Sequence, residues 1–161
     1  MINFSKLVRT LTAEAHCDIP CGIYDPVSAK IAAQTVQKMV MRINALEKPS
    51  CDDSASSAGD WATYENTLAR YVTVKEEHAQ LCKKELYILW ADYFRPEHVE
   101  QYPDLHSLVW NAGKLAGRNK QTVDAGAAEE LVGTVDKIAE IFWNTKNVTY
   151  SDPNAEVRFG A

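Results

Sequence analysis

Apolar residues recur every three or four positions along most of this 161-residue chain, and this period constrains its fold more than any other feature. No segment alternates apolar and polar residues for long enough to predict a β-strand. Four helices are predicted, joined by short connections, and such helices pack most simply as an antiparallel four-helix bundle. The predicted fold class is therefore all-α.

Proline, glycine and capping residues mark the ends of the first two predicted helices. The first begins after Asp25-Pro26 and ends at Lys48-Pro49. The polar stretch 50–60 has no helical period and is predicted to be a loop. The second helix runs from Trp61 to Phe94. Its expected apolar stripe comprises Tyr64, Leu68, Tyr71, Val74, His78, Leu81, Cys82, Leu86, Leu89, Trp90 and Tyr93.

The third predicted helix begins near Pro96 or Pro103 and ends at Gly117-Arg118-Asn119. The fourth has the apolar residues Ala127, Leu131, Val135, Ile138, Ile141, Phe142 and Trp143. Residues 148–161 are expected to form an irregular tail. The predicted division is a leader at 1–15, a metal-binding hook at 16–24, the four helices at 25–147 and the tail at 148–161.

Composition excludes two classes of partner. A formal net charge of −5 at pH 7 argues against a nucleic-acid surface, and no run approaches the roughly 18 apolar residues that cross a membrane. The four cysteines lie in a chain with ample apolar residues for a core, so we expect reduced thiols and a cytoplasmic protein. Residues 1–15 end in Ala-Glu-Ala, which is typical of a cleavage site, without the apolar stretch of an export signal.

Residues 16–26, HCDIPCGIYDP, gather a histidine, two cysteines and a tyrosine just before the first helix. The Cys-x3-Cys pair alone is weak and also fits two unremarkable loop thiols. Cleavage after Ala15 changes this, because the α-amine of His16 and the backbone nitrogen of Cys17 then chelate a metal together. The thiolates of Cys17 and Cys21 complete a planar set of two nitrogens and two sulfurs, which favours Ni(II) or Cu(II). The His16 imidazole would approach as an axial fifth ligand.

This stretch resembles the nickel hook of the nickel-type superoxide dismutases, whose pattern is His-Cys-Asp-x-Pro-Cys-Gly-x-Tyr-Asp-Pro. Every fixed position matches. The stretches LWADYFRP at 89–96 and IFWNTK at 141–146 resemble the end of the family's second helix and its C-terminal helix. The similarity extends from about residue 16 to residue 146.

The resemblance implies an antioxidant enzyme that converts superoxide to dioxygen and hydrogen peroxide by Ni(II)/Ni(III) cycling, with one nickel ion per subunit. It implies a homohexamer and a peptidase that removes the leader. The ligands carried over are the amine and imidazole of His16, the backbone nitrogen and thiolate of Cys17, and the thiolate of Cys21. Tyr24 and Tyr93 match tyrosines beside the open axial face, where they order water and admit the anion. Core packing at the base of the hook is the alternative role for both.

Other residues of the motif are expected to shape the hook. Pro20 turns the loop between the cysteines back on itself, and Asp18 either accepts backbone hydrogen bonds within the turn or remains a solvated carboxylate. Family members have a glutamate where Ala32 stands and an arginine where His78 stands, and these hold the axial imidazole. We therefore expect His78 to contact the imidazole of His16 directly or through water, the alternative being a histidine satisfied elsewhere in the core.

A protein of another class would fit the hook alone. A non-catalytic nickel or copper carrier on a helical bundle needs the same ligands, but it gains nothing from an axial face left open between two tyrosines. A redox dithiol is the weaker alternative, because the cysteines lack the two-residue spacing of thioredoxin-like sites. Cys51, Cys82, His98 and His106 show no ligand spacing and are expected to be structural or surface residues.

Overall fold

The computed structural model describes residues 23–50 and 58–160, and this part of the chain is helical with no strand. The all-α prediction is confirmed. In chain order the elements are α1 (Val27–Asn44), α2 (Ala58–Ile88), the π-helical turn η2 (Leu89–Tyr93), α3 (Pro96–Gln101), α4 (Leu105–Gln121), α5 (Ala125–Thr145) and α6 (Ala155–Phe159). None of the helices in these residues is long and apolar enough to span a membrane.

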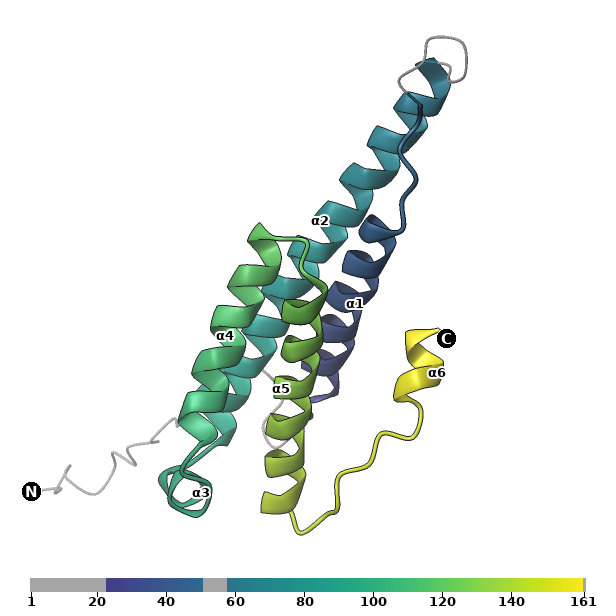
Figure 1. The fold of residues 1–161 in the computed structure, drawn as a ribbon. Coiled ribbons are helices and arrows are strands. Elements are labelled where there is room, and N and C mark those ends of the chain that lie inside the picture. The colour runs from purple at the N-terminus through teal and green to yellow at the C-terminus, as the bar shows by residue number, and fades with distance from the viewer. Residues whose placement is uncertain (1–22, 51–57, 161) are drawn as a thin grey trace, which may run out of the picture.

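The four long helices pack around a shared core. α1 lies against α2 and α5, and α4 lies against the same two helices, so that each has two neighbours (Figure 1). Neighbouring helices run in opposite directions along this arrangement (Figure 1). The fully buried side chains at its centre include Val36, Val40, Leu86, Leu105, Leu131, Val135, Ile138 and Phe142.

The predicted apolar stripe of the second helix is partly wrong. The buried residues of α2 are Lys75, Ala79, Cys82 and Leu86, whereas Leu81 is 41% exposed. The first half of α2 contains no buried residue, since the 31-residue helix extends beyond the ends of α4 and α5 (Figure 1). A stripe drawn by period alone does not show where the neighbouring helices end.

Lys75 occupies a core position because its ammonium group caps another helix. It is 2% exposed, and its Nζ donates hydrogen bonds to the backbone oxygens of Asn119, Lys120 and Thr122 at the end of α4. The last carbonyls of a helix have no partner within the helix, so this lysine satisfies three of them. Burial lowers the pKa of Lys75, against a smaller opposite effect of Glu76.

The third predicted helix is two helices. α3 begins at Pro96, as one of the two alternatives placed it, and α4 begins at Leu105 after the break at Pro103. Gly117 does not end α4, which continues to Gln121 and stops where Thr122 becomes extended. A single glycine weakens a helix without breaking it, so packing of α4 against α2 and α5 carries the helix through this position.

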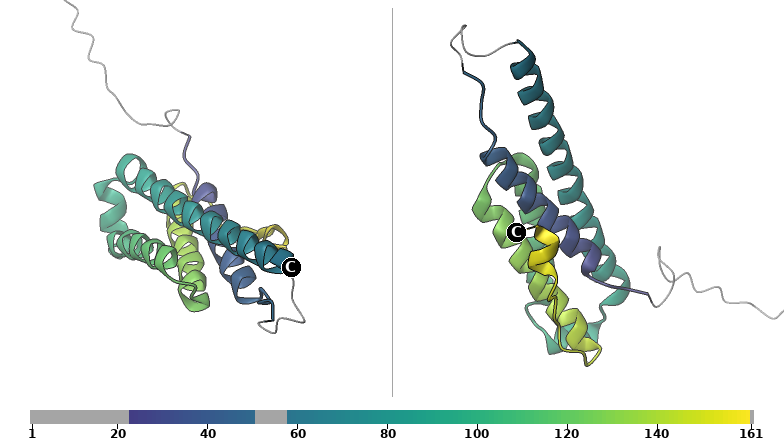
Figure 2. Two further views of the ribbon diagram at one scale, coloured as in Figure 1. Left: turned by 90° about the horizontal axis from the view of Figure 1, so that it is seen from above. Right: turned by 90° about the vertical axis from the view of Figure 1, so that its right-hand side faces the viewer.

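The C-terminal segment is more ordered than the predicted irregular tail. It returns along α5 and ends in α6, which packs against α1 (Figure 2, right). Gly160 ends α6 with a φ of 74°, the left-handed conformation that glycine adopts at helix ends without steric cost. No helical period marked this segment in the sequence, since α6 is only five residues long.

Candidate functional site

The predicted metal ligands lie outside the described residues. The residues that the structure does not describe include His16, Cys17, Asp18, Pro20, Cys21 and Cys51. The structure describes the base of the hook, from Ile23 onward. Ile23 is 70% exposed, whereas Pro26 is fully buried, so the chain passes from the surface into the helical body within these residues.

Asp25 and Pro26 precede α1, and Pro26 takes the N-cap position that was expected of Asp25, one residue before the first helical residue Val27. The Oδ1 atom of Asp25 accepts a hydrogen bond of 2.8 Å from the backbone nitrogen of Val27. The carbonyl of Pro26 accepts the first helical bond, from the nitrogen of Lys30, at 3.1 Å. Proline loses nothing here, since the first amides of a helix have no partner within it. The residues directly before α1 are therefore bonded to its first turn.

The two predicted tyrosines meet beside this connection. The ring centroids of Tyr24 and Tyr93 are 5.6 Å apart, with the rings tilted by 53°, a geometry typical of packed aromatic pairs. Tyr24 precedes α1 and Tyr93 ends η2, so the contact joins parts of the chain 69 positions apart. Both side chains are half-buried. Each phenol combines a packed ring with access to solvent.

Tyr93 is held at both ends. Its ring packs against Phe142 at a centroid distance of 4.4 Å and against Phe94 at 5.2 Å. Its hydroxyl lies 2.6 Å from Oγ1 of Thr145, which itself donates to the backbone oxygen of Phe142 at 2.7 Å. Because the single hydroxyl proton of Thr145 is used in that bond, Tyr93 is the donor to Thr145. The π-helical turn η2 sets this orientation, and such turns are frequent at functional sites.

Two residues beside Tyr93 were not predicted to belong to the site. His98 stacks on its ring at 5.7 Å, and the Nδ1 of His98 accepts a hydrogen bond of 3.2 Å from the backbone nitrogen of Arg95. The ammonium of Lys146 lies 5.1 Å from the centroid of the Tyr93 ring. Lys146 ends the stretch IFWNTK at 141–146, but nothing in the sequence predicts that it lies close to Tyr93.

The predicted contact of His78 with the imidazole of His16 involves a residue outside the described part of the chain, and His78 itself lies away from the tyrosines. Its Nδ1 lies 2.9 Å from the backbone oxygen of Val74 on the same helix, and its side chain is half-buried. His78 precedes Tyr93 by 15 positions, which is about 22 Å along a helix. Since the carbonyl of Val74 can only accept, neutral His78 carries its proton on Nδ1 and leaves Nε2 as an acceptor. Ala32 is completely buried.

The described residues hold no second metal site. No three histidine, cysteine, aspartate or glutamate side chains within 23–50 and 58–160 are grouped as metal ligands. Burial, with a smaller contribution from Glu85, raises the pKa of Cys82 to about 12, so its thiol stays protonated and is a poor ligand. His106 is exposed and meets the ring of Trp90 edge-on. The structural or surface roles predicted for these residues agree with their positions.

Comparison with known proteins identifies one family. The family model of nickel-containing superoxide dismutase matches residues 11–146. The chain is 36% identical over 132 residues to "Superoxide dismutase [Ni]" of Streptomyces seoulensis, covering 82% of this chain and 88% of that protein. It is 33% identical over 136 residues to the protein of the same name from Streptomyces coelicolor, covering 84% and 92%.

Solved structures agree with this match. The native nickel superoxide dismutase structure at 1.30 Å superposes with a TM-score of 0.68 and 32% identity, covering 83% of this chain and all of that one. A crystal structure of Ni-containing superoxide dismutase in the oxidised ligation state gives a TM-score of 0.67 and 35% identity over the same shares.

The described part of the chain is an all-helical protein with a tyrosine pair that begins just after the predicted ligands in the sequence. The match over most of the chain is more specific. The chain belongs to the nickel-containing superoxide dismutase family.

Proposed function

We propose that this protein is a nickel superoxide dismutase, which converts two superoxide anions and two protons to dioxygen and hydrogen peroxide. The observation that carries this proposal is the family match over residues 11–146. It includes the whole predicted hook and the two tyrosines that the structure places 5.6 Å apart. Relatives over most of the same length are superoxide dismutases that bear nickel in their names.

The residues of the hook fit nickel by the chemistry of their donors. One nickel ion per subunit would be held by the amine and imidazole of His16, the backbone nitrogen and thiolate of Cys17, and the thiolate of Cys21. Anionic thiolate and deprotonated backbone amide donors would suit Ni(II) better than zinc. When bound, the metal supplies the one-electron exchange, between Ni(II) and Ni(III), that dismutation requires.

The side chains at the base of the hook would handle the anion and its protons. Tyr93 donates its hydroxyl proton to Thr145, so its phenol oxygen presents lone pairs to water. Tyr24 faces it from the other side of the contact, and together the two phenols order water and limit access to small molecules. Lys146 adds a positive charge near this position, which attracts superoxide although the chain as a whole has a net charge of −5.

Three residues have supporting roles in the proposal. Asp18 and Pro20 shape the hook, and His78 offers an Nε2 acceptor to the imidazole of His16. About 22 Å of helix, through the end of α2 and η2, separates His78 from Tyr93, so contact with His78 requires that the hook extends along the helix away from the tyrosine pair. A His78→Ala variant with full activity and an unchanged Ni(III) spectrum would remove this role.

We propose the following architecture around the site. Residues 25–147 form an antiparallel four-helix bundle, from which residues 16–24 project as the hook, and a peptidase removes residues 1–15. The subunits assemble as a homohexamer in the cytoplasm. The opposite directions of neighbouring long helices support the bundle (Figure 1). The separation of the buried core from the exposed Ile23 supports a projecting hook.

A metal carrier without turnover is the less favoured alternative. It would use the same ligands, but it would not need a tyrosine pair at the base of the hook. The relatives that match over 82–84% of the chain are named as superoxide dismutases.

The deciding experiment compares superoxide consumption by two nickel-loaded proteins, one that starts at His16 and one with a single extra glycine before it. We expect activity only in the first, because the glycine converts the ligand amine into an amide. Equal activity in both would contradict the assignment of the His16 amine as a ligand. Nickel binding without turnover in both would favour the carrier.

A further inference from the structure

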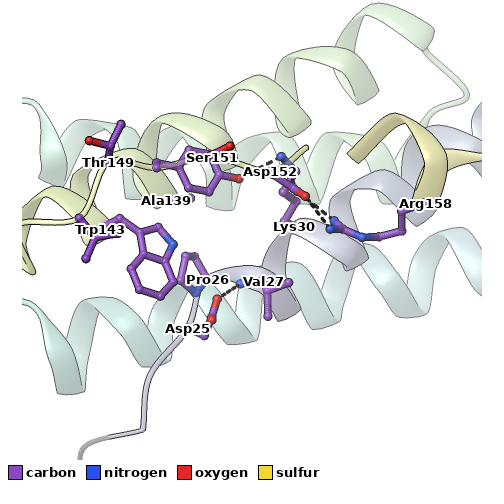
Figure 3. A pocket seen from close by; sticks show the side chains of 12 residues that line it. Asp25, Pro26, Val27, Lys30, Ala139, Trp143, Thr149, Ser151, Asp152 and Arg158 are labelled. Carbon is purple, nitrogen blue, oxygen red and sulfur yellow. Dashed lines mark hydrogen bonds and ion pairs between the residues drawn. The ribbon is translucent and has the colours of Figure 1, made fainter. Parts of the chain in front are cut away.

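The C-terminal tail, residues 147–160, lies beyond the part of the chain that matches the family model. It nevertheless returns to the base of the hook. The tail crosses from the end of α5 to α1, where α6 packs (Figure 2, right). A cavity of about 270 Å³ lies beneath it and is lined by Asp25, Pro26, Lys30, Trp143 and the tail itself (Figure 3).

Lys30, in the first turn of α1, is the buried centre of a partly exposed ionic network. Its side chain is 6% exposed, and its Nζ contacts Asp136 of α5 at 2.6 Å, Asp152 of the tail at 3.0 Å and the hydroxyl of Tyr150 at 3.0 Å. These three partners use all three donors of the ammonium group. Burial alone would lower the pKa of Lys30, but the hydrogen bonds to Asp136, Tyr150 and Asp152 raise it. The lysine is therefore charged and fully paired.

Asp152 ties this lysine to the end of the chain. Its two oxygens accept hydrogen bonds from the two terminal nitrogens of Arg158, at 2.7 and 3.1 Å, while it also faces Lys30 (Figure 3). Arg158 in turn donates to the side-chain oxygen of Gln34 at 3.1 Å, and Gln34 donates to the carbonyl of Ala155 at 3.2 Å. A bidentate pair of this kind fixes orientation as well as charge.

The network acts on the residues from which the hook projects. The backbone nitrogen of Lys30 bonds to the carbonyl of Pro26, so a lysine held by the tail also holds the buried proline at the start of α1. Trp143 and Pro26 line the same cavity (Figure 3). Tyr24, two positions before Pro26, contacts Tyr93. Movement at this turn would displace both the hook and one tyrosine of the pair.

We propose that residues 147–160 form a strap that positions the nickel hook, with Asp152 as the residue that joins the strap to Lys30 and so fixes the first turn of α1. The strap touches neither metal nor substrate. Its role is to hold the first turn of α1 and residues 23–26 before it, which directly follow the predicted ligands in the sequence, and so to slow loss of the metal. This inference rests on the proposed function only for its effect on nickel.

The test compares Asp152→Asn and a chain ending at Lys146 with the wild type. Hydrogen exchange of the peptide 23–34 in the full-length protein is expected to become on the order of tenfold faster in both variants. Loss of nickel to a chelator, from nickel-loaded proteins that start at His16, is expected to accelerate by a similar factor. Asp152→Glu keeps the carboxylate and is expected to show exchange and nickel loss close to the wild-type rates.

Lys38→Ala is the matched control. Lys38 also holds the tail, through the carbonyl of Gly160 at 3.2 Å and the ring of Phe159, but it lies two turns farther along α1. This variant should leave exchange at 23–34 and nickel retention unchanged.

Two results would overturn the strap. If the peptide 23–34 of the Asp152→Asn variant exchanged at the wild-type rate, the tail would not hold this turn. Faster exchange with unchanged nickel loss would show that it stabilises the helices alone. Absence of superoxide consumption by the wild-type protein that starts at His16 would instead reject the proposed function, and the exchange and chelation rates would still decide on the strap.

Discussion

At the scale of single residues, the ring and the hydroxyl of Tyr93 are held by different contacts. The ring is held by packing against Tyr24, Phe142 and Phe94, and the hydroxyl by Thr145. Removal of the hydroxyl should therefore leave the ring in place. The ammonium of Lys146 lies 5.1 Å from the centroid of that ring. Its local effect on an anion can therefore be tested separately from the effect of the net charge of the molecule.

Tyr93→Phe is expected to lower kcat/KM for superoxide roughly fivefold, the effect of one hydrogen bond of about 1 kcal/mol in the transition state. The free energy of unfolding should fall by about 1 kcal/mol or less, since Thr145 keeps its bond to Phe142. Pulse radiolysis and urea titration measure the two quantities. Tyr71→Phe, in the half of α2 without buried residues, is the control and should change neither. Full activity of Tyr93→Phe would assign this tyrosine to packing alone.

Lys146→Glu is expected to lower kcat/KM several-fold at low ionic strength, with a smaller difference from the wild type in high salt. The physical reason is the reversal of a charge beside the path of an anion. Lys137→Glu, nine positions earlier on α5, changes the net charge by the same amount about 13 Å away along the helix. If both variants lose the same activity, net charge rather than a local charge governs the rate.

At the scale of elements, tertiary packing decides where the helices begin, end and bury their faces. α4 passes through Gly113 and Gly117 because neighbouring helices support it on both sides. The two glycines differ in their surroundings. A Cβ at Gly113 would meet the hydroxyl end of Tyr87, whereas one at Gly117 would meet nothing within 4 Å.

Gly117→Ala is expected to raise the free energy of unfolding by roughly 0.5–1 kcal/mol, because alanine loses less backbone entropy than glycine in a helix. Urea or thermal unfolding measures this change. Gly113→Ala is the comparison and should gain less or lose stability, since Tyr87 must move aside. Destabilisation by Gly117→Ala would indicate a contact at this face that the single chain does not show.

The ionic contacts of the tail predict a dependence of its stabilising effect on pH. Burial would raise the pKa of Asp152, but hydrogen bonds from Arg158 and Lys30 and their charges lower it below its ordinary value of 3.8. The unfolded chain therefore binds the proton more readily than the folded one, so stability falls as the pH drops through this range. The contribution of the carboxylate is complete above pH 3.8 and is lost below it.

Asp152→Asn should accordingly cost about 2 kcal/mol of unfolding free energy at neutral pH, the size of a hydrogen bond to a charged group. The difference from the wild type should shrink as the pH falls below 3.8. Urea titrations of both proteins between pH 3 and 7 measure it. A difference that stays constant over this range would mean that the charge of Asp152 is not what stabilises the tail.

At the scale of the whole molecule, the predicted metal ligands and the hydrophobic core occupy separate parts of the chain. His16, Cys17 and Cys21 lie within six consecutive positions. The buried cluster extends from Ala29 to Phe142. Ligands so close in sequence can gather around a metal even when the helices are unfolded. A ligand that binds folded and unfolded chains alike does not stabilise the fold.

Removal of nickel is therefore expected to abolish superoxide consumption while the helical circular dichroism stays unchanged and the melting temperature shifts by less than about 3 °C. Chelation followed by a thermal scan makes the measurement, and reloading with nickel should restore activity. A much larger fall in melting temperature would show that the metal holds the helices together, contrary to the separation of the predicted ligands from the core residues along the sequence.

The sequence by itself determined the all-α class and the composition of the predicted metal site, because both depend on residues close together in the chain. A helix is recognised from side chains three or four positions apart, and the proposed ligands Cys17 and Cys21 are four positions apart. Tyr24 and Tyr93 could be named because each lies in a stretch that resembles the family.

Only the tertiary structure showed which distant residues meet. Tyr93 bonds to Thr145 across 52 positions, and Lys30 bonds to Tyr150 across 120. It also placed Lys75 in the core and Leu81 at the surface, and it showed that the segment predicted to be irregular ends in a short helix packed against α1. These contacts follow from how the long helices pack, which sets where each face is covered, and no local period in the sequence carries that information.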